Sequence, residues 1–93
     1  MKEAEVTIVN RLGVHARPSA ALTQTASRYR SDVWFTNARG RRVNGKSIMG
    51  VMMLAAACGS TLKVEVDGED EDAALDAITA LVASGFGEER GDA

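Results

Sequence analysis

The spacing of apolar positions along this 93-residue chain predicts alternating strands and helices. Four segments are expected to be strands, and the three longer ones have either the period-two alternation of a half-buried strand or the β-branched and aromatic residues that strands favour. These segments span residues 4–9, 32–36, 41–44 and 61–67. The turn at residues 37–40 is short and rich in turn-forming residues, so the second and third strands are expected to form a hairpin.

Three further segments have helical patterns. They span residues 16–29, residues 48–57, and a stretch with an acidic first turn at 69–72 that Gly85 ends. Ser47 is the expected N-cap of the middle helix. That helix has no polar face, so part of it is expected to lie exposed in so small a domain. The alternative is that it is entirely buried core.

The order βαββαβα favours an α+β fold, an open-faced two-layer sandwich in which three helices cover one face of a four-stranded antiparallel sheet. A ferredoxin-like arrangement fits the pattern alone equally well. We expect one domain over residues 1–87 and a polar, disordered tail over residues 88–93.

Composition narrows the classes of function. The net charge of −2 and the isoelectric point near 5.3 argue against a nucleic-acid-binding protein. No apolar run suits membrane insertion or a signal peptide, so a cytoplasmic location is expected. The single cysteine, Cys58, and the single histidine, His15, cannot form a zinc site or an intramolecular disulfide. We expect Cys58 to be buried or half-buried, and we expect no metal and no cofactor.

The residues that could take part in a reaction lie at the start of the first predicted helix. Pro18 suits a first helical turn, so the backbone N–H groups of Ala16 and Arg17 are expected to point outward and to form a small anion site beside His15. Arg17 adds a permanently charged guanidinium. A nucleophile, an anion cradle and a counter-charge are what phosphoryl transfer requires. The alternative for a lone histidine is an ordinary surface or capping residue.

A second motif suggests a competing function. Residues 40–47 match the P-loop spacing G-x-x-x-x-G-K-[ST], which is typical of nucleotide-binding ATPases. A P-loop follows a parallel strand and precedes a helix, whereas residues 41–43 in the middle of this motif resemble a strand. A coincidental match is therefore favoured.

Two segments resemble one family. Residues 13–18 resemble the Gly-x-His-x-Arg-Pro signature of the HPr family, the phosphocarrier proteins of the bacterial sugar phosphotransferase system, and residues 46–52 are similar to its second signature. The resemblance extends from about residue 4 to residue 86 and implies the HPr-like fold with sheet order 1-4-2-3. It also implies that His15 accepts the phosphoryl group, that Arg17 is its charge partner, and that Ser47 is a regulatory phosphosite.

The resemblance further implies the partners. These are enzyme I as donor, enzyme IIA domains as acceptors, and HPr kinase/phosphorylase acting on Ser47. The partner surface is expected to comprise Ile48, Met49, Val51 and Met52. Transient exchange among several partners favours a monomer.

Some alternatives stay open within this resemblance. Many sugar-system members carry lysines in the first helix, which this chain lacks, and Arg28 or Arg30 are candidate substitutes. The segment at 81–88 also looks like the nitrogen-related carrier NPr. A third possibility is a binding module that acts only through phosphorylated Ser47.

Overall fold

The computed structural model describes residues 1–89 and 91. It contains four strands: β1 (Lys2–Thr7), β2 (Asp32–Thr36), β3 (Arg42–Asn44) and β4 (Thr61–Asp67). It also contains three α-helices and one 3-10 turn: α1 (Ala16–Ser27), α2 (Ile48–Met52), α3 (Glu71–Ala83) and η1 (Gly85–Gly87). The predicted order of elements is confirmed, and the bounds of β2 and β4 match the expected segments.

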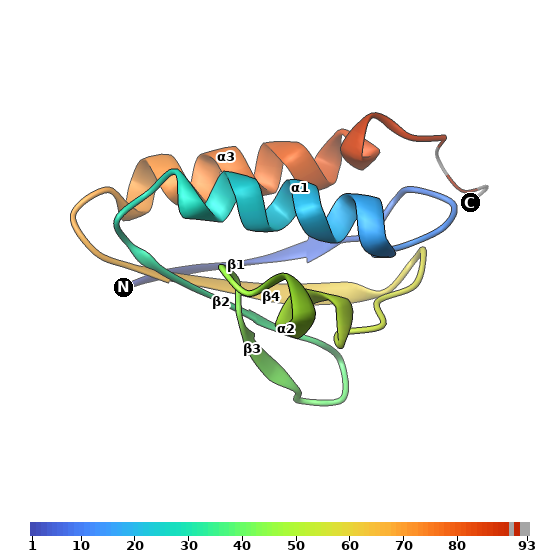
Figure 1. Cartoon of the computed structure of the whole chain (residues 1–93), viewed down its shortest axis with the longest axis horizontal. Coiled ribbons are helices and arrows are strands. Elements are labelled where there is room, and N and C mark those ends of the chain that lie inside the picture. Colours follow the sequence, from blue (N-terminus) through green and yellow to red (C-terminus); the bar gives the residue numbers. More distant parts are fainter. Residues whose placement is uncertain (90, 92–93) are drawn as a thin grey trace.

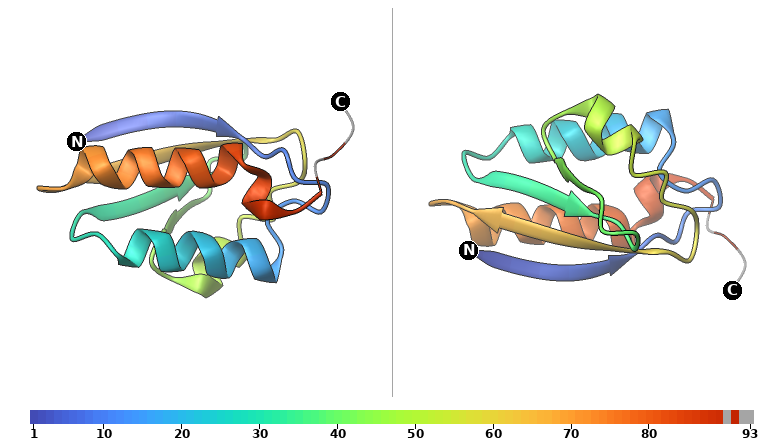
Figure 2. Two further views of the ribbon diagram at one scale, coloured as in Figure 1. Left: turned by 90° about the horizontal axis from the view of Figure 1, so that it is seen from above. Right: turned by 90° about the horizontal axis from the view of Figure 1, so that it is seen from below.

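The strands form one antiparallel sheet in the order β1-β4-β2-β3. Helices α1 and α3 run antiparallel to each other across one face of this sheet, and α2 lies beside α1 (Figure 1). The other face of the sheet is open. Seen from below, β1, β4 and β2 lie in front of the helices, and no described helix covers them (Figure 2, right). The open-faced two-layer sandwich with order 1-4-2-3 is therefore confirmed.

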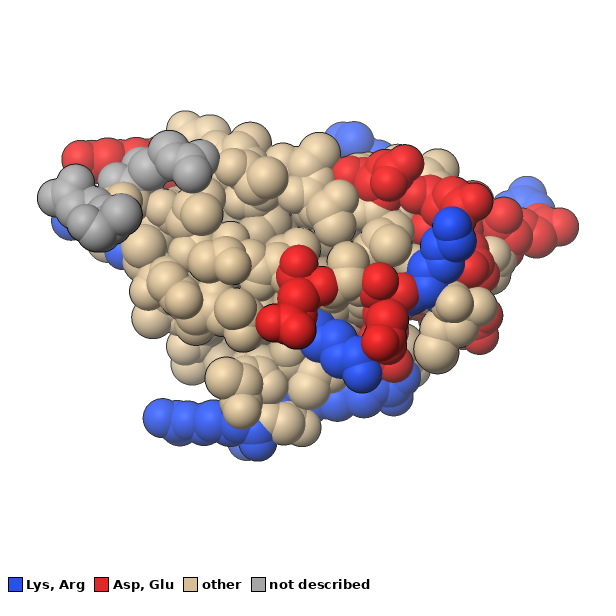
Figure 3. Space-filling view, turned by 180° about the vertical axis from the view of Figure 1, so that it is seen from behind, with Lys and Arg blue, Asp and Glu red and all other residues tan. Residues whose placement is uncertain are grey.

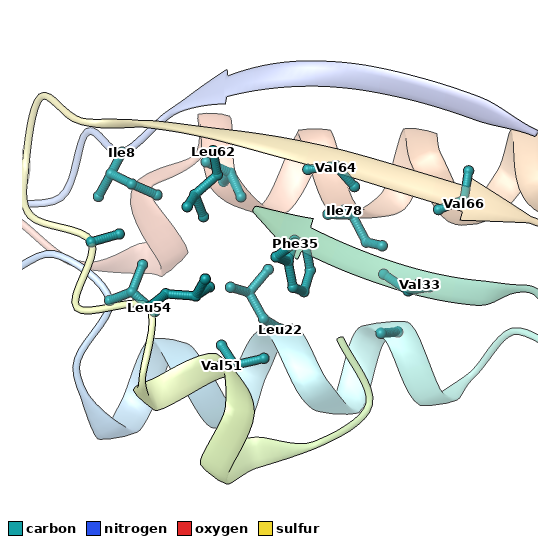
Figure 4. Packing of buried hydrophobic residues seen from close by; sticks show 14 of the residues in the cluster. Ile8, Leu22, Val33, Phe35, Val51, Leu54, Leu62, Val64, Val66 and Ile78 are labelled. Atoms are coloured by element: carbon teal, nitrogen blue, oxygen red, sulfur yellow. The ribbon is translucent and has the colours of Figure 1, made fainter. Parts of the chain in front are cut away.

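The core fills the space between the sheet and the helices. Phe35 of β2 lies at its centre and is fully buried, with Leu22 of α1 and Ile78 of α3 close to it (Figure 4). The inward residues of β4 are Leu62, Val64 and Val66, as the alternation predicts. Because α1 and α3 are anchored in this core, their ends are held in fixed positions relative to each other.

The P-loop match at residues 40–47 is coincidental. Its middle residues form β3, which pairs antiparallel with β2, so no parallel strand leads into a phosphate loop. Lys46, the residue that would contact nucleotide phosphates, instead donates a hydrogen bond from Nζ to the carbonyl of Tyr29 at 2.8 Å. The motif therefore serves the fold, by joining the start of α2 to the end of α1.

Helix α2 is shorter than the sequence predicts. It ends at Met52, and Ala55 then adopts a positive φ of 50°, which a continuing helix would not allow. The carbonyl of Leu54 accepts a hydrogen bond from Asn37, and that of Ala56 accepts one from Val14. These tertiary hydrogen bonds replace the helical ones that residues 53–57 were expected to make.

Two expectations about single residues are wrong. Val51 was expected on the partner surface, but it is fully buried against the core, because the short α2 turns this side of the helix inward. Cys58 was expected to be buried or half-buried, but its position in the turn before β4 leaves it exposed.

The segment expected to be a disordered tail makes specific contacts where it is described. The N–H of Arg11 donates to the carbonyl of Glu89 at 2.8 Å, and the N–H of Gly91 donates to the carbonyl of Val9, also at 2.8 Å. Residues 90, 92 and 93, on which this expectation also falls, lie outside the described residues. The chain after α3 therefore returns to the loop that precedes α1.

No helix in the described part of the chain has the length and apolar character needed to cross a membrane.

Candidate functional site

His15 is the N-cap residue of α1. Its carbonyl accepts a hydrogen bond from Ser19 N–H at 3.0 Å, which starts the helix, and its side chain is 37% exposed. The imidazole therefore lies at the mouth of α1, where a partner can reach it.

The loop before His15 is fixed by Gly13. This residue has a φ of +69°, and a Cβ built on it would lie 2.5 Å from the carbonyl oxygen of Ala56. Two backbone hydrogen bonds follow directly after Gly13. Val14 N–H donates to the carbonyl of Ala56, and His15 N–H donates to the carbonyl of Gly13. Only glycine fits this position, so the first residue of the Gly-x-His signature has a steric explanation.

The anion site expected beside His15 falls on the first turn of α1. Ala16 and Arg17 occupy the first turn of α1, where N–H groups have no intrahelical acceptor. The buried ring of Pro18 follows them, and Arg17 is exposed. The positive end of the helix dipole and the guanidinium both favour an anion here.

Glu88 belongs to the same site, and sequence reasoning missed it. Its Oε1 atom lies 3.0 Å from Nε2 of His15, although 73 residues separate the two in the chain. The same oxygen accepts a hydrogen bond from Nδ2 of the buried Asn10 at 3.1 Å. The hydrogen bond with His15, followed by that with Asn10 and the charge of Arg17, holds the pKa of Glu88 below its ordinary value.

The signal for Glu88 in the sequence is weak. Glycines at positions 85 and 87 end α3 and have positive φ, and Phe86 between them has a φ of 59°. Such a turn indicates that the chain reverses, but not which residue it then contacts. A shallow pocket at this place is lined by Arg11, Leu12, Arg17, Glu88 and Glu89.

Ser47 lies on the neighbouring helix. It is the N-cap of α2 as predicted, and its exposed hydroxyl accepts a hydrogen bond from the N–H of Gly50 at 3.2 Å. Since α2 lies beside α1, Ser47 and His15 occupy neighbouring elements.

The outer side of α2 is apolar and exposed. The exposed fractions are 42% for Ile48, 67% for Met49, 41% for Met52 and 56% for Met53. Met53, which immediately follows the helix, was not among the expected partner residues and takes the place of the buried Val51. Exposed methionines adapt to different apolar surfaces, so this side of α2 suits a partner interface.

The described residues contain no group of three His, Cys, Asp or Glu side chains that could hold a metal ion.

Comparisons with known proteins agree with this geometry. A family model described as "PTS HPr component phosphorylation site" matches residues 2–84. The phosphocarrier protein HPr of Cupriavidus necator is 54% identical over 88 residues, which cover 95% of this chain and 98% of the relative.

Solved structures give the same result. The structure of HPr-C-His from Thermoanaerobacter tengcongensis has a TM-score of 0.90 and 44% sequence identity, covering 96% of this chain and 99% of the other. An HPr dimer from the same organism has a TM-score of 0.75 and 43% identity, with coverages of 95% and 100%.

Proposed function

The chain belongs to the HPr family of phosphocarrier proteins, and from this membership we propose that His15 is the side chain that accepts the phosphoryl group. The protein is a phosphoryl carrier of the phosphoenolpyruvate-dependent phosphotransferase system, and not an enzyme that turns over a small molecule. One observation carries the assignment to His15: its partly exposed imidazole lies at the N-terminus of α1, beside free backbone N–H groups.

The roles of the neighbouring groups follow from their charge. In the proposed reaction a nitrogen of His15 attacks the phosphorus atom of the donor and forms a P–N bond. The phosphoryl oxygens are then held by the N–H groups of Ala16 and Arg17 and by the guanidinium of Arg17. Arg17 is exposed, so it can follow the phosphoryl group between donor and acceptor.

The proposed partners are enzyme I as donor and enzyme IIA domains as acceptors. Their proposed docking surface is the exposed side of α2, formed by Ile48, Met49, Met52 and Met53, together with the N-terminal end of α1. Transfer to several partners requires transient interfaces, which supports a monomeric working state.

Ser47 is proposed as a regulatory phosphosite for HPr kinase/phosphorylase. Its hydroxyl is exposed and stands directly before Ile48 and Met49 of the proposed docking surface. A phosphate there would add nearly two negative charges beside an apolar interface. These charges would repel an acidic partner, and burying them against an apolar partner would cost desolvation energy. This exposure also supports the second candidate, a regulatory module acting through phosphorylated Ser47, and the nitrogen-type carrier remains a third.

The test is intact-mass measurement after incubation with phosphoenolpyruvate, Mg²⁺ and enzyme I, with His15→Ala as the control. We expect one acid-labile phosphoryl adduct on the wild-type protein and none on His15→Ala. An acid-stable adduct, or an adduct that survives in His15→Ala, would contradict the assignment to His15.

A further inference from the structure

The contact between Glu88 and His15 is more enclosed than its place near the chain end suggests. The Glu88 side chain is 13% exposed, and its Oε1 atom lies 3.0 Å from Nε2 of the imidazole. Asn10, which is fully buried, donates from Nδ2 both to this oxygen and to the carbonyl of Gly13, at 3.1 and 2.7 Å. The carboxylate is therefore held in place from the core side while it contacts the ring.

The direction of this hydrogen bond can be assigned from charge. A glutamate carboxyl group has an ordinary pKa of about 4.3. The pKa of Glu88 lies below its ordinary value, so its carboxyl group is ionised at neutral pH. An ionised carboxylate can only accept hydrogen bonds. The proton of the neutral ring must then be on Nε2, and the lone pair on Nδ1.

We propose that Glu88 is a positioning residue for phosphoryl transfer: it fixes the tautomer of His15 and stabilises the charge that the ring gains when it is phosphorylated. This inference rests on the proposed role of His15. It assigns a function to a residue that lies outside the segment matched by the family model.

The transfer step shows where the charge arises. The lone pair on Nδ1 of His15 forms the new N–P bond, while the bond between phosphorus and the donor's own atom breaks and its electron pair leaves with the donor. No proton leaves His15, because Nε2 keeps its own. The ring therefore becomes a cation, and the Glu88 carboxylate faces the N–H that carries part of this charge. Transfer to the acceptor reverses each change.

A carboxylate beside a catalytic imidazole performs the same two tasks in the serine protease triad, where it orients the ring and stabilises the imidazolium. Here the charged side chains around the pocket are Arg11, Arg17, Glu88 and Glu89. Glu89 pairs with Nε of Arg11 at 3.3 Å. Glu88 is thus the carboxylate among them that contacts the ring, and Glu89 provides a matched control.

Three variants test the proposal. Glu88→Ala removes both the acceptor and the charge. Glu88→Gln keeps an acceptor without the charge, because the N–H of Asn10 requires an oxygen, and not an amide N–H, at the Oε1 position. Glu89→Gln removes one negative charge from the same pocket without touching His15.

The first readout is the tautomer of His15, measured by ¹⁵N NMR of the ring at alkaline pH, where an imidazole is neutral. We expect the wild type, Glu88→Gln and Glu89→Gln to carry the proton on Nε2, and Glu88→Ala to show a mixture of tautomers. This measurement needs no phosphoryl donor, so it tests Glu88 even if the proposed role of His15 fails.

The second readout is the rate of His15 phosphorylation by enzyme I. Glu88→Ala should be slower than wild type by about tenfold or more, a loss like that seen when a group that orients a metal-ligating histidine is removed. Glu88→Gln should lie between them, and Glu89→Gln should match the wild type. The proposal is overturned if Glu88→Ala keeps a single Nε2–H tautomer, or if its rate equals that of Glu89→Gln. A wild-type protein that shows the Nε2–H tautomer but accepts no phosphoryl group would instead overturn the proposed function.

Discussion

The antiparallel helices α1 and α3 meet at two ends, and a carboxylate joins them at each. At one end Asp70, just before α3, accepts hydrogen bonds from the N–H groups of Arg30 and Ser31 and from the Ser31 hydroxyl. At the other end Glu88, just after α3, contacts His15 and Asn10. The two carboxylates occupy similar places, but their partners differ in chemistry.

The partners decide what each carboxylate can do. Asp70 accepts from backbone and hydroxyl donors that do not titrate, and the Ser31 hydroxyl together with Arg30 N–H lowers its pKa to about 2. Glu88 faces an imidazole, whose proton can move and whose second nitrogen is a nucleophile. The same hydrogen-bonding group therefore supports the fold at one end and reactivity at the other.

The charged surface side chains are also distributed unequally between the two ends. Most of the Asp and Glu side chains visible from behind lie toward the end where α3 begins, with Lys and Arg side chains among them (Figure 3). Ion pairs at the start of α3 include Lys2 with Asp72 and the chain's amino group with Glu71. Exposed pairs of this kind contribute little to stability, so the Asp70 contacts are the more specific link at that end.

The largest expected effect is the loss of function in His15→Ala. Phosphorylation should disappear, whereas the free energy of unfolding should fall by only about 1 kcal/mol, because the variant loses the hydrogen bond between the partly exposed ring and Glu88. Mass measurement and urea unfolding check the two parts. A large loss of stability would mean that this end also supports the fold, and the contrast with Asp70 would weaken.

Ser47→Asp should give the next largest effect, also on rate and not on folding. The added charge lies before the exposed Ile48 and Met49, so phosphorylation by enzyme I should slow by about tenfold. Ser47→Ala is the matched control. It should keep the wild-type rate and lose about 1 kcal/mol of stability with the N-cap hydrogen bond. Equal rates for the two variants would refute the docking surface proposed on α2.

Asp70→Asn should affect stability and leave the phosphorylation rate unchanged. The pKa of Asp70 is lowered on folding from 3.8 to about 2, so its contribution is fully present above pH 4 and is lost as the pH falls toward 2. The wild-type protein should therefore lose stability over this window, and the variant, already less stable at neutral pH, should lose less. Unfolding curves at several pH values measure this, and parallel curves for both proteins would contradict it.

Lys46→Met should give the smallest effect. It removes the hydrogen bond from Nζ to the carbonyl of Tyr29, near the end of α1 that Asp70 supports. A cation at a helix C-terminus contributes about 1 kcal/mol or less, so a small fall in stability is expected. Phosphorylation should proceed at the wild-type rate. A slower rate would show that α2 needs this contact to hold the docking surface.

The sequence predicts the sheet better than it predicts the sites that depend on distant contacts. The bounds of β2 and β4 follow from alternation and turn residues, which are local signals. Residues 48–57 give no such signal, because every position except Gly50 is apolar; hence Val51 could not be assigned to the core, nor Met53 to the surface. The end of α2 depends on hydrogen bonds to Asn37 and Val14, far away in the chain.

The residues of the candidate site also differ in how far the sequence predicts them. His15, Arg17 and Ser47 belong to short motifs and could be named from the sequence. Glu88 comes after the last helix, in a segment whose composition is typical of a tail. Its position depends on where α3 ends in space, which no local pattern contains.

Helices α1 and α3 are nearly equal in length, so the contacts at their two ends depend on that length. They have 12 and 13 residues, which at 1.5 Å per residue gives roughly 18 and 20 Å. One residue inserted into α3 would turn everything beyond it by about 100°. With Asp70 fixed at one end, Glu88 would then swing away from His15 at the other. Insertions and deletions are therefore expected to be tolerated in the loops beyond Asp70 and Glu88, and not within α3.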